Sequence, residues 1–162
     1  MKNIRGQFPI LTKKINGRAM IYFDNAATSQ KPQSVINSMV DFYTKHNSNV
    51  HRGINPLAEE ATRQYENARK KVKEFINANS TQEIIFTKGA TESINLIAQS
   101  WGRKNLKKGD IVVLSIAEHH ANFVPWLQLK KEIGIEIDVI SLTGKGYLDI
   151  QKAKNLLTQK KV

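Results

Sequence analysis

Two amphipathic helices are the first elements that the apolar pattern of the chain predicts. Apolar residues recur at intervals of three and four within residues 35–43, which is the repeat of one helix face. The same repeat runs through residues 57–76 and predicts a longer helix. An extended arm precedes the first helix, and the polar stretch 77–82 ends the second. We therefore expect residues 1–82 to form an arm and two helices.

Strands and helices alternate in the rest of the chain. Short apolar runs predict three strands, at residues 84–87, 111–115 and 136–142. Helices are predicted to follow them, at residues 94–101, at 125–133, and from a cap at Asp149 to about Gln159. This alternation is typical of an α/β fold, in which helices cover a mainly parallel sheet. Three strands are few for such a sheet, so we expect residues 83–162 to be the first, incomplete part of a larger domain.

The charge of the chain is strongly positive but not concentrated. The sequence has 25 Lys and Arg against 14 Asp and Glu, a net charge of +11. Such a charge favours nucleic acid when it is gathered into one stripe. Here the basic residues form separate pairs, such as Lys70-Lys71 and Lys130-Lys131, which is typical of a solvated surface. We therefore expect no nucleic-acid partner.

The composition also limits the compartment and the chemistry. No apolar run has the length that a bilayer span needs, and the first residues lack the apolar core of a signal peptide. A cytoplasmic protein without a membrane partner is the resulting expectation. The chain has no cysteine, which excludes disulfides and thiolate metal ligands within it.

A glycine turn between the first predicted strand and the following helix is one candidate site. It reads Thr87-Lys88-Gly89-Ala90-Thr91-Glu92-Ser93. Gly89 is expected to let the backbone turn tightly and approach a ligand. The N–H groups of Ala90 and Thr91 would then lie at a helix N-terminus, which favours an anion. The alternative is that Thr91 only caps its own helix, and such caps are common.

A second candidate site, Glu118-His119-His120, follows the predicted strand at residues 111–115. These side chains suggest a metal site, although adjacent ligands lack the usual metal spacing. Alternatively, the ring of His119 lies flat against a planar cofactor and exchanges protons near neutral pH. A third interpretation is that both histidines are polar loop residues bonded to backbone.

The amino-terminal segment holds two further candidates. Asp24-Asn25-Ala26-Ala27-Thr28 is expected either to let a substrate approach the backbone or to form a tight turn. His51 and Arg52 lie in a polar loop, where an arginine is suited to bind a carboxylate or phosphate. Taken alone, this loop is equally explained as a solvated connection.

Taken together, these segments resemble the cysteine desulfurases of the sulfur-mobilisation type and the related selenocysteine lyases. Both are pyridoxal-phosphate (PLP) enzymes of aminotransferase class V, with PLP fold type I. The matching stretches are Tyr22 to Pro32, Val50-His51-Arg52-Gly53, Phe86 to Leu96, Ser100-Trp101-Gly102 and Glu118 to Trp126. Their order and intervals also match, so the resemblance covers nearly the whole chain.

The resemblance implies a role for each candidate. Gly89, Ala90 and Thr91 would hold the PLP phosphate, and His119 would stack on the ring and assist proton transfer. The substrate side would be lined by Asp24, Asn25, Ala26, Ala27, His51 and Arg52. The family reaction converts L-cysteine to L-alanine and leaves a persulfide on an enzyme cysteine, for iron-sulfur cluster assembly. A homodimer and a sulfur-acceptor protein are implied as partners, and no metal is.

The chain also departs from the family pattern. None of its lysines lies in the Ser-Gly-His-Lys motif that supplies the Schiff-base lysine, and it has no persulfide cysteine. Asn55-Pro56 replaces a more usual His-Thr pair, and Lys88 replaces a common arginine. We therefore expect the amino-terminal fragment of a cysteine desulfurase, inactive on its own. The alternative is a non-catalytic remnant or a binding subunit that docks on a partner.

Overall fold

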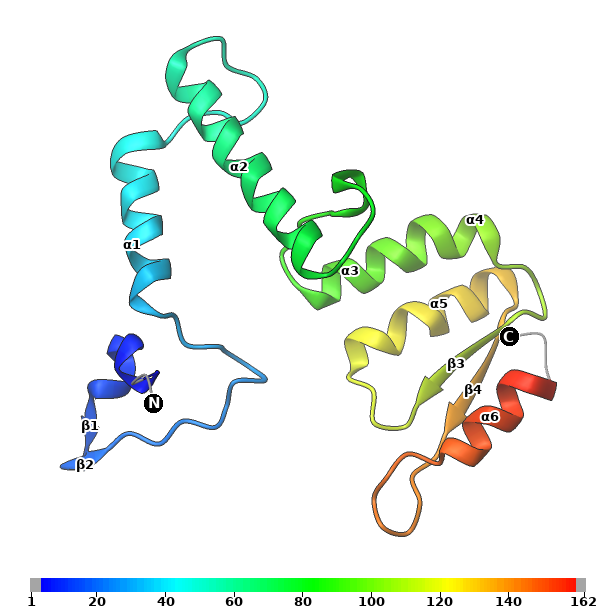
Figure 1. The fold of residues 1–162 in the computed structure, drawn as a ribbon. Helices are drawn as coiled ribbons and strands as arrows, with labels where there is room; N and C mark the ends of the chain where they lie inside the picture. Colours follow the sequence, from blue (N-terminus) through cyan, green and yellow to red (C-terminus); the bar gives the residue numbers. More distant parts are fainter. Residues whose placement is uncertain (1–3, 160–162) are drawn as a thin grey trace. The chain divides into compact units, whose positions relative to one another are not determined.

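The computed structural model describes residues 4–159 and divides into two compact units between Ile84 and Ile85. The helices are α1 (Gln33–Asp41), α2 (Pro56–Phe75), α3 (Ala90–Ile97), α4 (Arg103–Asn105), α5 (Val124–Ile133) and α6 (Ile150–Gln159). The strands are β1 (Lys14–Ile15), β2 (Arg18–Ala19), β3 (Ile111–Ser115) and β4 (Glu136–Ile140) (Figure 1). Within the described residues, no helix combines the length and apolar character that a membrane span requires. The predicted division into domains at residue 82 stays a prediction.

A tight hairpin lies in the arm of the first unit. Strands β1 and β2 pair antiparallel, with Lys14 opposite Ala19. The two residues between them, Asn16 and Gly17, have φ angles of 52° and 78°. Positive φ at both positions is the geometry of a two-residue turn that suits the twist of a hairpin. Only an extended arm was expected here, although Asn-Gly is a common hairpin sequence.

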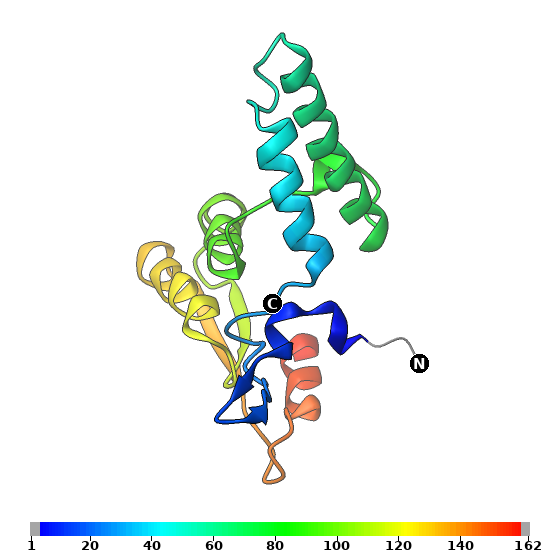
Figure 2. The same ribbon diagram turned by 90° about the vertical axis from the view of Figure 1, so that its left-hand side faces the viewer.

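The two predicted amphipathic helices are confirmed as α1 and α2. A π-helical turn, Phe42–His46, extends α1 and contacts α2 (Figure 2). At the start of α2 the Asn55 side chain accepts a hydrogen bond from the Ala58 N–H at 2.9 Å. Ala58 is fully buried, and Gly53 approaches it so closely that an added Cβ would lie 2.0 Å from the Ala58 Cβ. The loop before α2 is therefore fixed by a cap and by a contact that only glycine allows.

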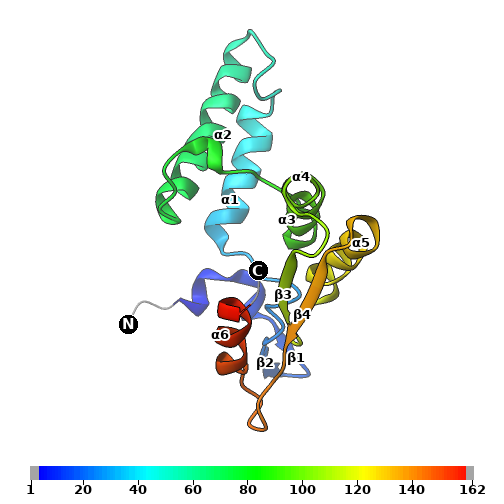
Figure 3. The same ribbon diagram turned by 90° about the vertical axis from the view of Figure 1, so that its right-hand side faces the viewer.

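The parallel pair β3 and β4 forms the sheet of the second unit. Their register runs from Ile111 opposite Glu136 to Ser115 opposite Ile140. Helix α5 connects the two strands and packs against β4 (Figure 3). Ala98, Leu129 and Ile135 are fully buried and form the core of this unit. The predicted strand–helix–strand order is confirmed, with β4 ending two residues before the predicted Leu142.

The other predicted helices of this unit are present as α3 and α6, but one predicted strand is not. Helix α3 continues through a π-helical turn, Ala98–Gly102, into α4. Helix α6 is capped as expected, because Asp149 Oδ1 accepts a hydrogen bond from the Lys152 N–H at 2.9 Å. The predicted strand at residues 84–87 is wrong, since this segment is not part of either sheet. A strand requires a neighbouring strand, and in the described chain β3 pairs only with β4.

Candidate functional site

The turn before α3 places its polar side chains around the start of that helix. The Thr87 and Ser93 hydroxyls bond each other at 2.7 Å, with Thr87 Oγ1 also 3.3 Å from the Gly89 carbonyl oxygen. The Glu92 carboxylate accepts a hydrogen bond from the Lys88 N–H. These bonds tie the incoming segment to the first turn of α3, but none of them uses the N–H groups of Ala90 or Thr91.

The first turn of α3 therefore keeps its anion-binding groups. The first N–H groups of a helix have no acceptor within the helix and carry the positive end of its dipole. Gly89 is the N-cap, and no side-chain hydrogen bond caps the helix there. Thr91 is exposed, and its hydroxyl forms no hydrogen bond within the described residues. The alternative that Thr91 serves as the cap of its own helix is wrong, because Thr91 is the second residue of α3.

Gly89 differs from the tight turn that the sequence suggested. Its φ of 160° and ψ of 179° describe an extended backbone. A Cβ added to Gly89 would meet no atom of the described chain within 4 Å. The space at Gly89, directly before the first turn of α3, is therefore open in the described chain.

The loop after β3 carries His119 on its surface. His119 is the N-cap of a 3₁₀ turn, His120–Asn122, and this turn contacts α3. The Nδ1 atom of His119 accepts a hydrogen bond from the Ala121 N–H at 3.1 Å. A neutral ring with this bond carries its proton on Nε2. The structure thus brings the His119 loop and α3 together in one unit.

The Glu118 carboxylate accepts hydrogen bonds from two neighbouring side chains. Its Oε1 accepts from the Ser115 hydroxyl at 2.7 Å, and its Oε2 accepts from the Asn122 amide at 2.8 Å. The Asn122 amide, followed by the Ser115 hydroxyl, holds the pKa of Glu118 below its usual value. Within the described residues no three His, Asp or Glu side chains gather as a metal site would require. The metal interpretation of this loop therefore has no structural support in the described chain.

The segment from Asp24 to Thr28 forms a closed turn in the first unit. The Thr28 N–H donates to the Asp24 carbonyl at 3.1 Å. The Tyr22 hydroxyl bonds the carbonyl oxygens of both residues, at 3.0 Å and 2.5 Å. The tight-turn interpretation of this segment is thus confirmed. Its other predicted role, lining the substrate side with Asp24, Asn25, Ala26 and Ala27, stays a prediction.

His51 has an unusual backbone conformation that α2 supports. Its φ is 68°, in the left-handed region that a non-glycine residue rarely adopts. The His51 N–H donates to the Thr62 hydroxyl at 2.9 Å, and Nε2 lies 3.1 Å from the Glu66 carboxylate. The His51 ring also meets the Tyr65 ring edge-on, with centroids 5.8 Å apart. Arg52, the next residue, is exposed.

The side chains that support His51 come from one face of α2 and were not among the expected site residues. Tyr65 and Glu66 each lie three or four positions from both Thr62 and Arg69, so the four residues share one face of α2. Arg69 pairs with Glu66 at 3.2 Å and places its guanidinium 5.1 Å from the Tyr65 ring. A polar stripe on an amphipathic helix is the signal that could have revealed this cluster.

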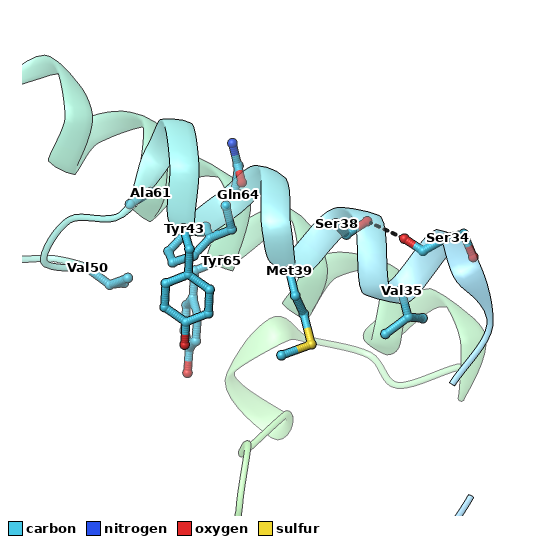
Figure 4. Close-up of a pocket in the computed structure, with 10 residues that line it drawn as sticks. Ser34, Val35, Ser38, Met39, Tyr43, Val50, Ala61, Gln64 and Tyr65 are labelled. Atoms are coloured by element: carbon cyan, nitrogen blue, oxygen red, sulfur yellow. Dashed lines mark hydrogen bonds between the residues drawn. The ribbon is translucent and has the colours of Figure 1, made fainter. Parts of the chain in front are cut away.

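An apolar groove lies between α1 and α2 (Figure 4). It includes none of the predicted site residues. Its lining comprises Ser34, Val35, Ser38, Met39, Phe42, Tyr43, Val50, Ala61, Gln64 and Tyr65. None of these lining residues is charged, so the groove suits apolar contact.

The comparisons with known proteins place these features in one family. The model of the family "Aminotransferase class-V" matches residues 21–162. The chain belongs to the class-V aminotransferases. The match includes the turn before α3, His119 and the His51 loop.

Known class-V aminotransferases agree with this assignment. A probable cysteine desulfurase of Staphylococcus aureus is 48% identical over 94% of this chain and 37% of its own. The solved apo cysteine desulfurase of Thermococcus onnurineus has a TM-score of 0.83 and 38% identity, covering 94% of this chain and 36% of its own. A solved C-DES mutant with glycine covalently linked to its PLP cofactor has a TM-score of 0.67 over 85% of this chain and 33% of its own. At 19% identity this last protein shows only a shared fold.

The chain corresponds to one part of these class-V enzymes. It spans from 25% to 39% of the length of the first curated relatives that it matches. The expected α/β fold of the PLP fold type I enzymes is confirmed by the solved cysteine desulfurases.

Proposed function

We propose that this chain supplies the phosphate-binding corner and the ring-stacking histidine of a PLP-dependent cysteine desulfurase. The open first turn of α3 is the observation that carries the proposal, because its N–H groups and the Thr91 hydroxyl remain available. Gly89, Ala90 and Thr91 would hold the phosphate, and His119 would lie against the pyridine ring. Membership of the class-V family supports PLP as the ligand.

Each residue has a physical task in this proposal. The Ala90 and Thr91 N–H groups and the Thr91 hydroxyl donate to phosphate oxygens, and the helix dipole adds a favourable charge interaction. Gly89 leaves the space that the phosphate needs. The Nε2 atom of His119, which carries the proton of the neutral ring, is the ring nitrogen free to donate near the substrate. When bound, PLP supplies the electron withdrawal that lets the Cα–H and C–S bonds of cysteine break.

The full reaction needs groups that this chain does not contain. Converting L-cysteine to L-alanine requires a thiol to accept the sulfur, and the chain has no cysteine. The lysine motif that binds PLP covalently is also missing. We therefore propose that the chain alone binds PLP reversibly and does not release sulfur. Asp24, Asn25, Ala26, Ala27, His51 and Arg52 would line the substrate side of the complete enzyme.

The compartment, the oligomeric state and the partners of the complete enzyme are proposed from the same family. The complete enzyme would be a cytoplasmic homodimer that passes sulfur to an acceptor protein for iron-sulfur cluster assembly. The second candidate function is a non-catalytic subunit that docks on a polypeptide carrying the rest of the class-V fold. The exposed apolar side chains of α1 favour this candidate, since such a surface suits a protein partner.

A binding experiment with an unreactive ligand tests the phosphate corner. PLP reacts with surface lysines, so the probe is pyridoxine 5′-phosphate, which has no aldehyde, compared with pyridoxine. We expect quenching of tryptophan fluorescence by the phosphorylated ligand alone. Thr91→Val removes one hydrogen bond to a charged group, worth about 1.5 kcal/mol or more, and should weaken binding about tenfold. Equal binding of the two ligands would contradict the proposal.

Two controls sharpen this experiment. Thr158→Val removes a helix-face hydroxyl of α6 that bonds the Lys154 carbonyl at 2.9 Å, and it should leave binding unchanged. Gly89→Ala adds a methyl group where the described chain leaves open space, so it should preserve the fold but weaken binding. Incubation with PLP, L-cysteine and a reductant should release no sulfide. Sulfide release proportional to the purified chain would show that the inactivity proposal is wrong.

A further inference from the structure

A chain of side-chain hydrogen bonds surrounds the loop that carries His119. The Ser115 hydroxyl donates to Glu118 at 2.7 Å, and the Asn122 amide donates to the same carboxylate at 2.8 Å. The Trp126 indole N–H then donates to the Asn122 side-chain oxygen at 3.1 Å. The result is a continuous path from the end of β3 to the first turn of α5.

Both ends of this path are fixed. Ser115 is the last residue of β3 and pairs with Ile140 of β4. Trp126 packs against the buried core formed by Ala98, Leu129 and Ile135. The loop between these anchors is thus held by the sheet on one side and by the core on the other.

The hydrogen-bonded side chains of Ser115, Glu118, Asn122 and Trp126 form a brace around the loop at residues 116–125. His119 lies in this loop, but its side chain is not part of the brace. Its carbonyl oxygen accepts from the Asn122 N–H at 2.8 Å, so the residue that bonds Glu118 also fixes the His119 backbone. The Ala121 N–H donates to Nδ1, which orients the ring. The ring itself is exposed. Four hydrogen-bonded side chains, those of Ser115, Glu118, Asn122 and Trp126, are therefore arranged around a histidine that is not part of the core.

We propose that Glu118, Asn122 and Trp126 are positioning residues that hold the His119 ring with Nδ1 on the Ala121 N–H and one face of the ring toward the ligand. The proposal rests on the proposed function only for the identity of that ligand. A ring held in this way loses little rotational freedom on binding a flat partner, so pre-organisation raises affinity. The bonded carboxylate of Glu118 also stays ionised at neutral pH, which keeps both of its hydrogen bonds strong.

A loop brace that only stabilises the fold would give the same hydrogen bonds, so the test must observe the ring directly. The ¹⁵N shifts of Nδ1 and Nε2 report which nitrogen carries the proton, and ¹³C relaxation of the ring reports its order. Both are measured on the whole chain without ligand, and the His119 signals are assigned from a His119→Gln variant. Affinity for pyridoxine 5′-phosphate is measured on the same samples.

Trp126→Phe and Trp101→Phe make a matched pair. The first removes the indole N–H from Asn122 while keeping an aromatic ring against the core. The second changes the other tryptophan of the same unit, which is 57% exposed and outside the path. We expect Trp126→Phe to mix the two His119 tautomers, increase ring motion and weaken ligand binding about three- to tenfold. Trp101→Phe should change none of these.

Glu118→Gln provides a second variant in case Trp126→Phe does not fold. It keeps the size of the side chain but replaces one of the two accepting carboxylate oxygens with an NH2 donor, so one hydrogen bond is lost and the ring should loosen in the same way. Unchanged His119 shifts and ring order in folded variants would overturn the proposal. So would weaker binding without any change at the ring, because the brace would then act only on stability. If the parent chain binds no pyridoxine 5′-phosphate, the proposed function fails, whereas the ring measurements still decide whether the brace positions His119.

Discussion

Replacing Gly53 with alanine should destabilise the unit that contains α1 and α2. The added Cβ would lie 2.0 Å from the Cβ of Ala58, whereas two carbon atoms in contact are separated by about 3.5–4.0 Å. Ala58 is fully buried in the first turn of α2, and a Cβ cannot rotate away as a longer side chain can. The backbone must therefore move by about 1.5–2 Å, which corresponds to an overpacking cost of about 1–3 kcal/mol.

Thermal unfolding of the whole chain, followed by far-UV circular dichroism, measures this cost. For a unit of this size each kcal/mol corresponds to a decrease in Tm of roughly 4–8 °C. Gly144→Ala is the matched control, because its added Cβ would meet no described atom within 4 Å. Its Tm should stay close to that of the parent, within the effect of about 0.5 kcal/mol typical of surface changes.

A second substitution tests whether the contact itself is the cause. Ala58→Gly removes the atom that clashes, at a cost of up to about 1 kcal/mol in helix propensity. The double variant Gly53→Ala, Ala58→Gly should unfold at a higher temperature than Gly53→Ala alone. If Gly53→Ala unfolds with the parent, or if the two effects simply add, the inferred contact is wrong.

Three further predictions concern caps and charge. Asn55→Ala should cost about 1 kcal/mol because the Ala58 N–H loses its acceptor, and Asn55→Asp should retain most of the stability when thermal unfolding of both is compared. Gly134→Ala should cost about 1 kcal/mol in the same assay, because Gly134 ends α5 with a φ of 78°. Since the folded pKa of Glu118 is lowered, its contribution to stability is present above the usual glutamate pKa of about 4.3 and is lost as pH falls through the folded value. Glu118→Gln should therefore reduce the acid sensitivity of unfolding, and an unchanged dependence on pH would contradict this.

The elements predicted from the sequence were those with a strong internal repeat. The apolar stripes of α1 and α2 and the apolar runs of β3 and β4 each identify their element without reference to the rest of the chain. The segment Ile84–Thr87 has the same local composition as a strand, but pairing depends on a neighbour that a local pattern does not specify. The hairpin at Asn16 and Gly17 was not predicted because its strands are only two residues long, which is too short for an alternating apolar pattern to appear.

The candidate site shows a similar division. Thr91 and His119 were predicted as site residues because they are polar and lie next to a glycine turn or after a strand. The family resemblance then suggested PLP as their ligand. The groups that hold these residues in place could not be predicted from the sequence. Their hydrogen bonds depend on how the loop folds, and no known sequence motif specifies them. Trp126 is an example, since its spacing suits a core residue and its hydrogen bond to Asn122 depends on the loop between them.

The groove between α1 and α2 also has a consequence for how the chain tolerates substitution. Val35, Met39 and Tyr43 on its α1 side are 40%, 55% and 67% exposed, so polar replacements there should cost the folded chain little. If another polypeptide covers the groove in the cell, the same replacements would lower the abundance of the chain, because they would break a contact that protects it. The abundance in cells of variants with polar residues at these positions would therefore distinguish a groove exposed to water from one covered by a partner.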